Sequence, residues 1–219
     1  MTPPLSAFTA RERALIARLR TPLGVQRWLN GLPYNTEAGG ETQKSFRQVV
    51  RSGSAHCMEA AVSAATILEQ HGYPPLVMSL ESVDLLDHVL FVYRTDGGWG
   101  SIARSRDPGL HGRKPVFASA RALALSYVDP YVDATGRVRG YAVVNLDEEL
   151  GSYDWRLSTR NLWKAEQLLV DWPHHRIGMS DRRYHALRRR YLAYREATGR
   201  KPLFYANRHT WKPLPPEFS

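Results

Sequence analysis

Hydrophobic residues recur at three- and four-residue steps over the N-terminal part of the chain, which is the spacing of amphipathic helices. Leu15, Ile16 and Leu19 form the first such stripe, and it follows Thr9 and Glu12, which have the spacing of a capping box. A first helix is therefore expected from about Thr9 to Leu19.

The next segment predicts two shorter helices with a loop between them. Pro22 suits the first turn of a helix that Gly31 ends. Glycine and polar residues predict a loop over 34–45. Ser45 is expected to cap a short helix that runs through Val50.

A continuous apolar stripe follows on a predicted helix that begins at Cys57. Gly72 and the pair Pro74–Pro75 end this helix. Cys57 itself lies on the stripe, in the first helical turn. The other members of the stripe are Ala60, Ala61, Ala64, Ala65 and Leu68.

After this helix the pattern changes to the short alternating and apolar runs of strands. Residues 76–80 predict a short strand, and the β-branched and aromatic residues 89–93 predict a strand buried on both faces. His88 stands at the entrance of the second strand. A tight turn at 96–98 indicates that residues 99–103 return as its antiparallel partner.

Turn residues and helical periodicity alternate over the second half of the chain. A capped helix is expected over 119–128, and residues 138–146 are expected to form the edge strand of a small hairpin around Gly136. Two more helices are expected over 158–169 and 180–198. The proline- and aromatic-rich tail beyond them is expected to lie across the surface.

Together these elements predict an α+β fold, in which the helix that starts with a cysteine packs on a small antiparallel sheet. At 219 residues the chain lies within the size range of one domain with extensions. The expected single domain covers 1–219. It has a core at about 45–146, N-terminal helices over 9–30 and a C-terminal helical extension over 158–199.

Composition and charge exclude some classes of protein. No stretch approaches the roughly 20 apolar residues of a membrane-spanning helix, so no membrane partner is expected. The start of the chain lacks the pattern of a secretory signal, and a cytoplasmic location is expected. The net charge of +9 is not accompanied by a standard nucleic-acid-binding motif, and a helix near the C-terminus spreads much of it around a solvated face. Nucleic acid is therefore not an expected partner.

Cys57 is the one cysteine of the sequence, which excludes an intramolecular disulfide and a four-cysteine zinc site. A lone cysteine is either an inert core residue or a nucleophile. At a helix N-terminus, the dipole and free amide groups lower the pKa of a thiol and can hold an oxyanion. His88, at the start of a strand that packs against this helix, can be its base. The other histidines lack metal-ligand spacing, so neither a metal nor a cofactor is expected.

Four short motifs follow one another in the middle of the chain. They are Gly53-Ser-Ala-His-Cys57-Met-Glu-Ala60, Gly72-Tyr-Pro74, Asp87-His88-Val-Leu and Gly98-Trp99. In this order and structural context, the segment 51–103 resembles the transglutaminase-like (papain-like) cysteine hydrolase superfamily. The resemblance implies a papain-like core with Cys57 as nucleophile and His88 as base. It also implies a peptide, isopeptide or small amide as substrate.

One position departs from the pattern of that superfamily, whose members usually carry an Asp a few residues after the Trp. This chain has Ser-Ile-Ala at 101–103 instead. Asp107 is the nearest downstream acid and is expected to orient the imidazole of His88. Asp87 is expected to point to the other face of a regular strand. Loss of the third member either leaves a weakly active pair or removes activity altogether.

Other polar residues near the predicted site have less specific roles. His56 is expected to cap the helix or to lie at the surface, because a helix residue one position away faces a different direction. Gln43 or Gln48 can complete an oxyanion hole, and their spacing does not choose between them. A basic loop either favours an acidic or carboxylate-bearing substrate or is simply solvated. Its cations are Arg104, Arg106, Arg113 and Lys114.

Two functions from different classes are compatible with these residues. In the first, His88 deprotonates Cys57, and the thiolate attacks an amide or similar acyl carbon, with hydrolysis expected rather than cross-linking. In the second, a non-catalytic protein of the same fold holds a peptide or an anion. They differ in the thiol pKa, which only an activated site depresses. Nucleic-acid binding through the arginine-rich C-terminal helix ranks third.

Overall fold

Residues 2–85 and 87–218 are described in the computed structural model, and they form eight α-helices and five β-strands. The helices are α1 (Ala10–Arg18), α2 (Pro22–Asn30), α3 (Phe46–Ser52), α4 (Cys57–Glu69), α5 (Ala120–Val128), α6 (Leu146–Leu150), α7 (Trp163–Asp171) and α8 (Asp181–Thr198). The strands are β1 (Leu76–Ser82), β2 (His88–Thr95), β3 (Gly98–Ile102), β4 (Val138–Asn145) and β5 (His175–Arg176).

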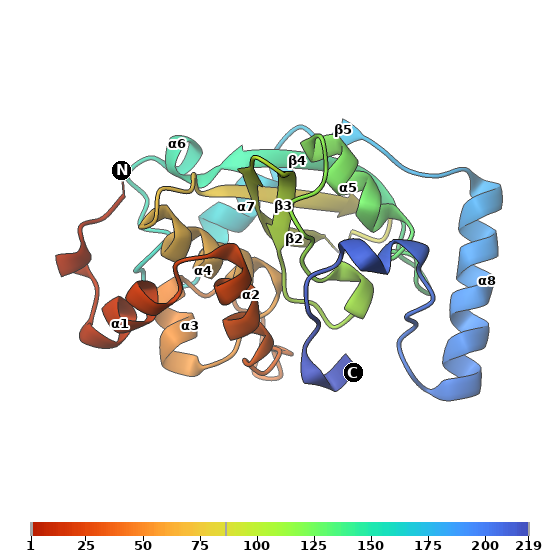
Figure 1. The fold of residues 1–219 in the computed structure, drawn as a ribbon, viewed down its shortest axis with the longest axis horizontal. Coiled ribbons are helices and arrows are strands. Elements are labelled where there is room, and N and C mark those ends of the chain that lie inside the picture. Colours follow the sequence, from red (N-terminus) through yellow and green to blue (C-terminus); the bar gives the residue numbers. More distant parts are fainter. Residues whose placement is uncertain (1, 86, 219) are drawn as a thin grey trace.

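The strands pair in the order β3-β2-β1-β4-β5, and each neighbouring pair is antiparallel. Helices α1 to α4 gather on one side of the sheet, while α8 stands at the far end of the molecule (Figure 1). The described residues therefore have the α+β class that the sequence predicts.

Capping residues set the start of the N-terminal helices. The Thr9 side chain accepts from the amide of Glu12, and the Glu12 carboxylate accepts from the amide of Thr9 at 2.7 Å. Ser45 and Gln48 form the same reciprocal box at α3. Each box satisfies amide groups that have no partner within the helix. The three helices predicted ahead of Cys57 are confirmed.

Alternate residues of the central strands face two separate hydrophobic clusters, one on each side of the sheet. Val77 and Phe91 belong to the cluster that contains the alanines of α4, and Met78 and Leu90 belong to the cluster that contains α5. Strand β2 is thus buried on both faces, as predicted. The predicted hairpin is also confirmed, since β2 and β3 pair antiparallel across the turn at 96–97.

Two predictions for the second half of the chain are wrong. Strand β4 pairs with β1 on one side and β5 on the other, so it is not the edge of a local hairpin. Its partner lies some 60 residues earlier in the chain, a pairing that local turn signals do not encode. Helix α7 begins at Trp163 rather than 158. Ser158 exchanges hydrogen bonds with the backbone of Arg160, a side-chain turn that competes with helix formation.

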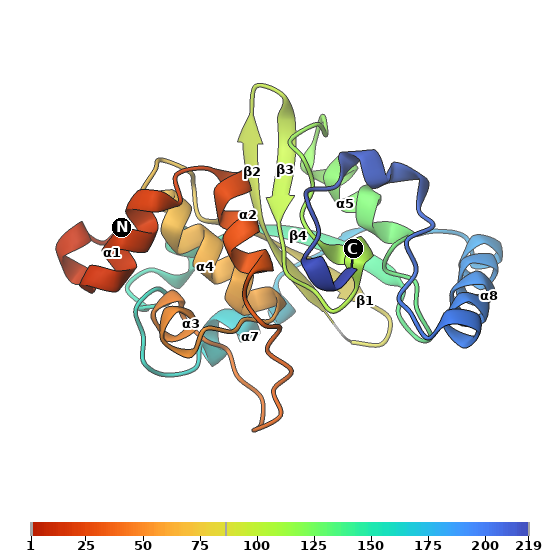
Figure 2. The same cartoon turned by 60° about the horizontal axis from the view of Figure 1, so that its bottom comes forward.

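The segment after α8 folds back over α5 and lies beside β3 in the view of Figure 2. Trp211 and Lys212 are buried, and Trp211 forms a backbone bridge with Arg113. Near the end of the chain, the Glu217 carboxylate lies 2.7 Å from the Arg104 guanidinium. The tail is therefore packed into the molecule, and the prediction that it lies across the surface holds for only part of it.

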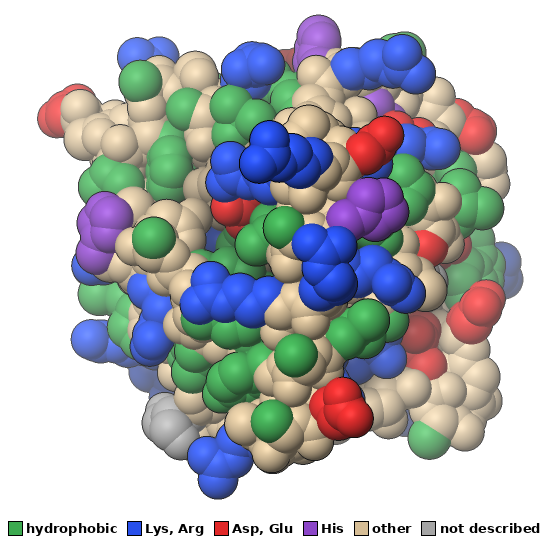
Figure 3. All heavy atoms as spheres, turned by 90° about the vertical axis from the view of Figure 1, so that its right-hand side faces the viewer, with side chains coloured by type: hydrophobic (Ala, Val, Ile, Leu, Met, Phe, Trp, Pro, Cys, Tyr) green, Lys and Arg blue, Asp and Glu red, His purple; other side chains and the backbone are tan. Residues whose placement is uncertain are grey.

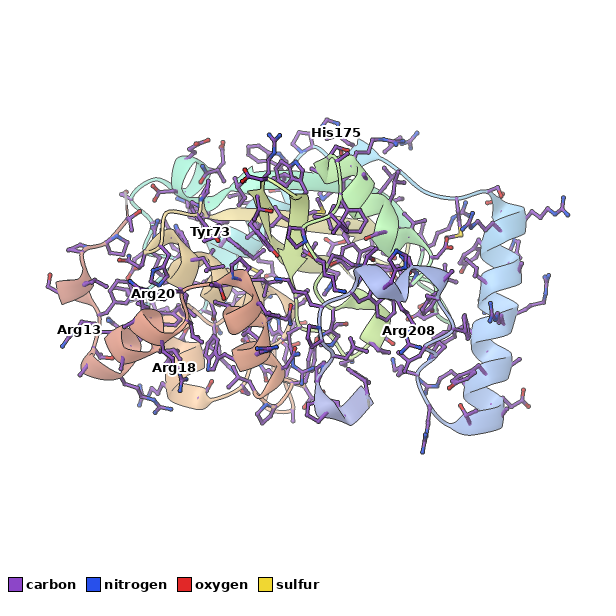
Figure 4. All side chains as sticks on the ribbon, viewed as in Figure 1. Arg13, Arg18, Arg20, Tyr73, His175 and Arg208 are labelled. Atoms are coloured by element: carbon purple, nitrogen blue, oxygen red, sulfur yellow. The ribbon has the colours of Figure 1, made fainter. Side chains whose placement is uncertain are left out.

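Basic side chains are distributed over the surface. Tyr191 is the one buried residue of α8, and the face that this helix occupies shows several separate Lys and Arg groups (Figure 3). Arg13, Arg18 and Arg20 lie at the opposite end of the molecule (Figure 4). Among the described residues, no helix is long and apolar enough to cross a membrane.

Candidate functional site

The candidate site is a cavity of about 100 Å³ at the N-terminus of α4. Cys57, the first residue of this helix, is partly exposed and lines the cavity together with His88. Gly53 ends α3 with a φ of 72°, in the left-handed region that favours glycine. Because of this turn, only four residues separate the end of α3 from the start of α4, and the thiol of Cys57 lies at the N-terminus of α4.

His88 is the first residue of β2, and its ring is buried. Its Nε2 lies 2.8 Å from the carbonyl oxygen of Leu110. Because a carbonyl only accepts, Nε2 carries the proton of the neutral ring. The lone pair then lies on Nδ1, which is the nitrogen that can take a proton from a thiol. The ring also contacts the edge of Tyr127, with centroids 6.5 Å apart.

A buried arginine fixes the loop that supplies this carbonyl. The Arg113 guanidinium donates to the carbonyl oxygens of Gly109 and His111, each at 2.6 Å. These two residues flank Leu110 on either side. The cation itself lies over the ring of Tyr127 at 4.0 Å, and a second aromatic ring covers it as well. The position of the Leu110 carbonyl is therefore set by a charge-assisted network rather than by a free loop.

Asp107 lines the cavity, but its carboxylate has a different partner from the expected one. Its Oδ1 lies 2.5 Å from Nζ of Lys201, while the Leu110 carbonyl occupies Nε2 of His88. The expectation that Asp107 orients the imidazole is corrected accordingly. The short 3-10 helix at 108–110 turns the backbone toward the ring, which brings a carbonyl where a carboxylate was expected.

The thiol of Cys57 lies among groups that favour its ionised form. Burial raises its pKa, but hydrogen bonds and charge from His56 and His88 outweigh burial, and its pKa lies well below the ordinary value. Sγ is 4.0 Å from Nδ1 of His56. His56 is buried and caps α4, so the expectation of a cap is confirmed and that of surface exposure is wrong.

Three other residues, Asp87, Gln43 and Gln48, lie differently from what the sequence predicts. Asp87 lines the cavity, because β2 begins only at His88 and strand alternation does not extend to the residue before it. Gln43 donates to Glu166 at 2.5 Å, and Gln48 donates to a backbone carbonyl of the 158–162 segment. Neither glutamine lines the cavity with Cys57.

The basic loop does not form a positive mouth. Arg104 is buried against Glu217, Arg113 is buried as described above, and Lys114 donates to backbone carbonyls of the tail. Of the four cations, Arg106 alone is among the residues that line the cavity. Four carboxylates line it too, namely Asp84, Asp87, Asp107 and Asp133. An acidic substrate therefore gains no support from the lining.

Tyrosines also line the cavity, and no local pattern in the sequence predicts this. They come from four distant segments and are Tyr34, Tyr131, Tyr191 and Tyr205. Burial, then the negative charge of Cys57, raises the pKa of Tyr34. Its phenol therefore stays neutral and can donate a hydrogen bond. In the described part of the chain, no group of three His, Cys, Asp or Glu side chains is arranged to hold a metal ion.

No protein-family model and no curated protein match this chain. Among solved structures, Legionella pneumophila LapG is similar at 15% identity and a TM-score of 0.39, with 68% of this chain and 89% of that chain covered. Its EGTA-treated form gives 12% identity and a TM-score of 0.38 over the same shares. Its calcium-bound form gives 14% and 0.34, covering 63% of this chain and 78% of the other. Similarity at this level does not assign a family to the chain.

Proposed function

We propose that this protein is a cysteine-dependent amide or peptide hydrolase with a transglutaminase-like, papain-like core. One observation carries the proposal: a thiol at the first residue of a helix shares a cavity with an imidazole whose other nitrogen is fixed by a backbone carbonyl. Nucleophile, base and orienting group are the three parts that such catalysis needs. A carbonyl replaces the usual carboxylate in the third role.

In the proposed reaction, Nδ1 of His88 takes the proton of the Cys57 thiol. The thiolate attacks the carbonyl carbon of the amide and forms a tetrahedral intermediate. When the C–N bond breaks, the protonated His88 gives its proton to the departing amine, which leaves a thioester on Cys57. Water then attacks the thioester, with His88 as base, and an acid and the free thiol are released.

The N-terminus of α4 supplies stabilisation for the oxyanion. The first amide groups of a helix have no partner within the helix and lie at the positive end of its dipole. Cys57 provides the first of these amides, so its own N–H is placed to receive the negative oxygen. The neutral hydroxyl of Tyr34, in the same cavity, is the side-chain donor we assign in place of the two glutamines.

The size of the cavity limits what enters it. With about 100 Å³ of space, the cavity is smaller than the roughly 300–1,000 Å³ of pockets that hold drug-sized ligands. This favours a small amide or an extended peptide or isopeptide segment as the substrate.

The test is the rate of iodoacetamide alkylation against pH in the wild type and in His88→Ala. Because the chain has one cysteine, the reaction reports Cys57 alone, and Cys57→Ala is the blank. We expect a midpoint well below about 8.5 in the wild type and an upward shift in His88→Ala. A midpoint near that value in both proteins contradicts the proposal and favours a non-catalytic protein that binds peptides or anions.

A further inference from the structure

A second imidazole lies beside the thiol. His56 precedes Cys57 directly, and its Nδ1 is 4.0 Å from Sγ. Its Nε2 lies 2.7 Å from the carbonyl oxygen of Thr42, which only accepts, so this nitrogen carries a proton. The ring is buried and its direction is fixed at both nitrogens.

A buried carboxylate stands behind this imidazole. Oε1 of Glu59 lies 3.4 Å from Nε2 of His56, and its Oε2 accepts from the backbone amide of His56 at 3.0 Å. Glu59 is fully buried and accepts further hydrogen bonds from Asn35, Thr42 and the amide of Lys44. These donors suit an ionised carboxylate. Within one helical turn, the imidazole of His56 thus has the carboxylate of Glu59 near one ring nitrogen and the thiol of Cys57 near the other.

We propose that His56 is a second functional imidazole, which holds the thiolate of Cys57 by a charged hydrogen bond from Nδ1 and is itself held by Glu59. The inference rests on the proposed function, because a thiolate nucleophile is what the charge stabilises. In this proposal the two histidines have different roles. His56 stabilises the ionised sulfur, and His88, whose Nε2 contacts the Leu110 carbonyl, moves the proton.

A capping box accounts for the Glu59 bond to the His56 amide and for the bond at Nδ1, but not for the groups at Nε2 or the sulfur beside Nδ1. The amide of Met58 donates to Nδ1 of His56 at 3.3 Å, which requires a lone pair on that nitrogen. When Nδ1 is protonated, the long hydrogen bond from the Met58 amide is lost, and the new N–H is directed at the sulfur of Cys57. The helix cap requires a lone pair on Nδ1, whereas the hydrogen bond to the thiolate requires a proton there. Whether Cys57 is ionised therefore determines which of the two interactions forms.

The charges around His56 favour its protonated form. Glu37 lies 3.8 Å from Nε2, and Lys44, 3.7 Å from Glu59, is the opposing cation on the same loop. Glu166 of α7 adds a further negative charge, and His88 faces the sulfur from β2. Burial lowers the pKa of His56, but the hydrogen bond and charge of Cys57, with the charge of Glu59, raise it to about 9.

The experiment compares His56→Asn with the wild type and His88→Ala. The Oδ1 atom of asparagine accepts from the helix amide as a good cap does, while the charge of the imidazole is lost. The apparent pKa of the thiol, read from alkylation rate against pH, is expected to rise by about one unit or more. Below both midpoints this means an approximately tenfold lower alkylation rate.

The outcomes separate the inference from the proposed function. If His56→Asn titrates like the wild type while His88→Ala is shifted, His56 is only a cap, and the hydrolase proposal stands. If the wild-type midpoint lies near about 8.5 and His88→Ala leaves it there, both fail.

A second measurement decides the matter if His56→Asn does not fold. The ring resonance of His56 is titrated by NMR in the wild type and in Cys57→Ser, which keeps the helix start and removes the thiolate. Because coupling between two titrating groups is mutual, the pKa of His56 is expected to fall in Cys57→Ser. Equal midpoints in the two proteins overturn the inference.

Discussion

The Leu110 carbonyl oxygen lies 2.8 Å from Nε2 of His88, and this contact fixes the tautomer of the candidate base. A backbone oxygen carries no full charge, so it orients the ring while stabilising an imidazolium less than a carboxylate does. A second imidazole, that of His56, lies beside the sulfur and has the carboxylate of Glu59 near its other nitrogen. The negative charge of Glu59 therefore lies next to His56, whereas the Nε2 atom of His88 contacts a neutral carbonyl.

The first prediction concerns Asp107, which pairs with Lys201 at a partly exposed position. We expect Asp107→Asn to leave the alkylation midpoint of Cys57 within about half a pH unit of the wild type, because screened pairs of this kind contribute little. Lys201→Ala serves as the matched control for loss of the pair. A shift as large as that of His88→Ala would show that Asp107 acts on the imidazole after all.

The second prediction concerns Arg113, whose fork donates to the carbonyls on both sides of Leu110. Lysine keeps the charge and loses the fork. We expect Arg113→Lys to lower the free energy of unfolding by about 2 kcal/mol, from lost bonds to a buried cation, as measured by urea denaturation. The rate of acyl transfer to Cys57 should fall as well, because the carbonyl behind His88 loses its support.

Arg183→Lys provides the control for that experiment, because Arg183 forms an exposed ion pair with Asp129. Its effect on stability is expected to be within about 0.5 kcal/mol. If the two substitutions change the free energy of unfolding equally, then the burial of Arg113 and its fork geometry do not contribute to stability.

Local signals in the sequence predict the central elements well and the site only in part. The small residues before Cys57, the alanines after it and the run from His88 are sufficient to predict a cysteine at a helix start and a histidine at a strand start, which line one cavity in the structure. The periodicity of the sequence cannot predict that the Leu110 carbonyl contacts His88, because every residue has a backbone carbonyl whatever its type. Helical geometry separates neighbouring side chains and so predicts no contact between His56 and Cys57, but that rule does not apply at the N-cap, where the backbone is extended.

A third prediction addresses Tyr34, whose neutral phenol shares the cavity with Cys57. Loss of one oxyanion donor typically slows acyl transfer by a factor of 100 or more, so we expect Tyr34→Phe to slow acylation by at least about tenfold. The measurement is the burst of nitrophenol released from p-nitrophenyl acetate. Tyr73→Phe, outside the cavity, is the control. An unchanged burst rate would show that the Tyr34 hydroxyl is not an oxyanion donor, and the Cys57 amide would be the one donor that we assign.

The last prediction concerns Lys212, a buried lysine in the C-terminal tail. Its Nζ has no hydrogen-bond partner among the described residues and lies 4.6 Å from the ring centre of Tyr93. Burial lowers the pKa of this amine to about 7, whereas its value in the unfolded chain is about 10.4. Between these pH values the unfolded state holds a proton that the folded state lacks. The free energy of unfolding should therefore rise as the pH increases from about 7 to about 10.

Lys212→Met keeps the length and removes the ionisable group. It is expected to stabilise the protein at neutral pH by on the order of 1 to 3 kcal/mol, since an unpaired buried cation is costly, and to flatten the rise toward alkaline pH. Lys164→Met is the matched control, because Lys164 also lies over a tyrosine ring but is exposed. Urea denaturation at several pH values gives both curves. Destabilisation by Lys212→Met, or an unchanged slope, would show that the amine is charged and well solvated in the folded protein.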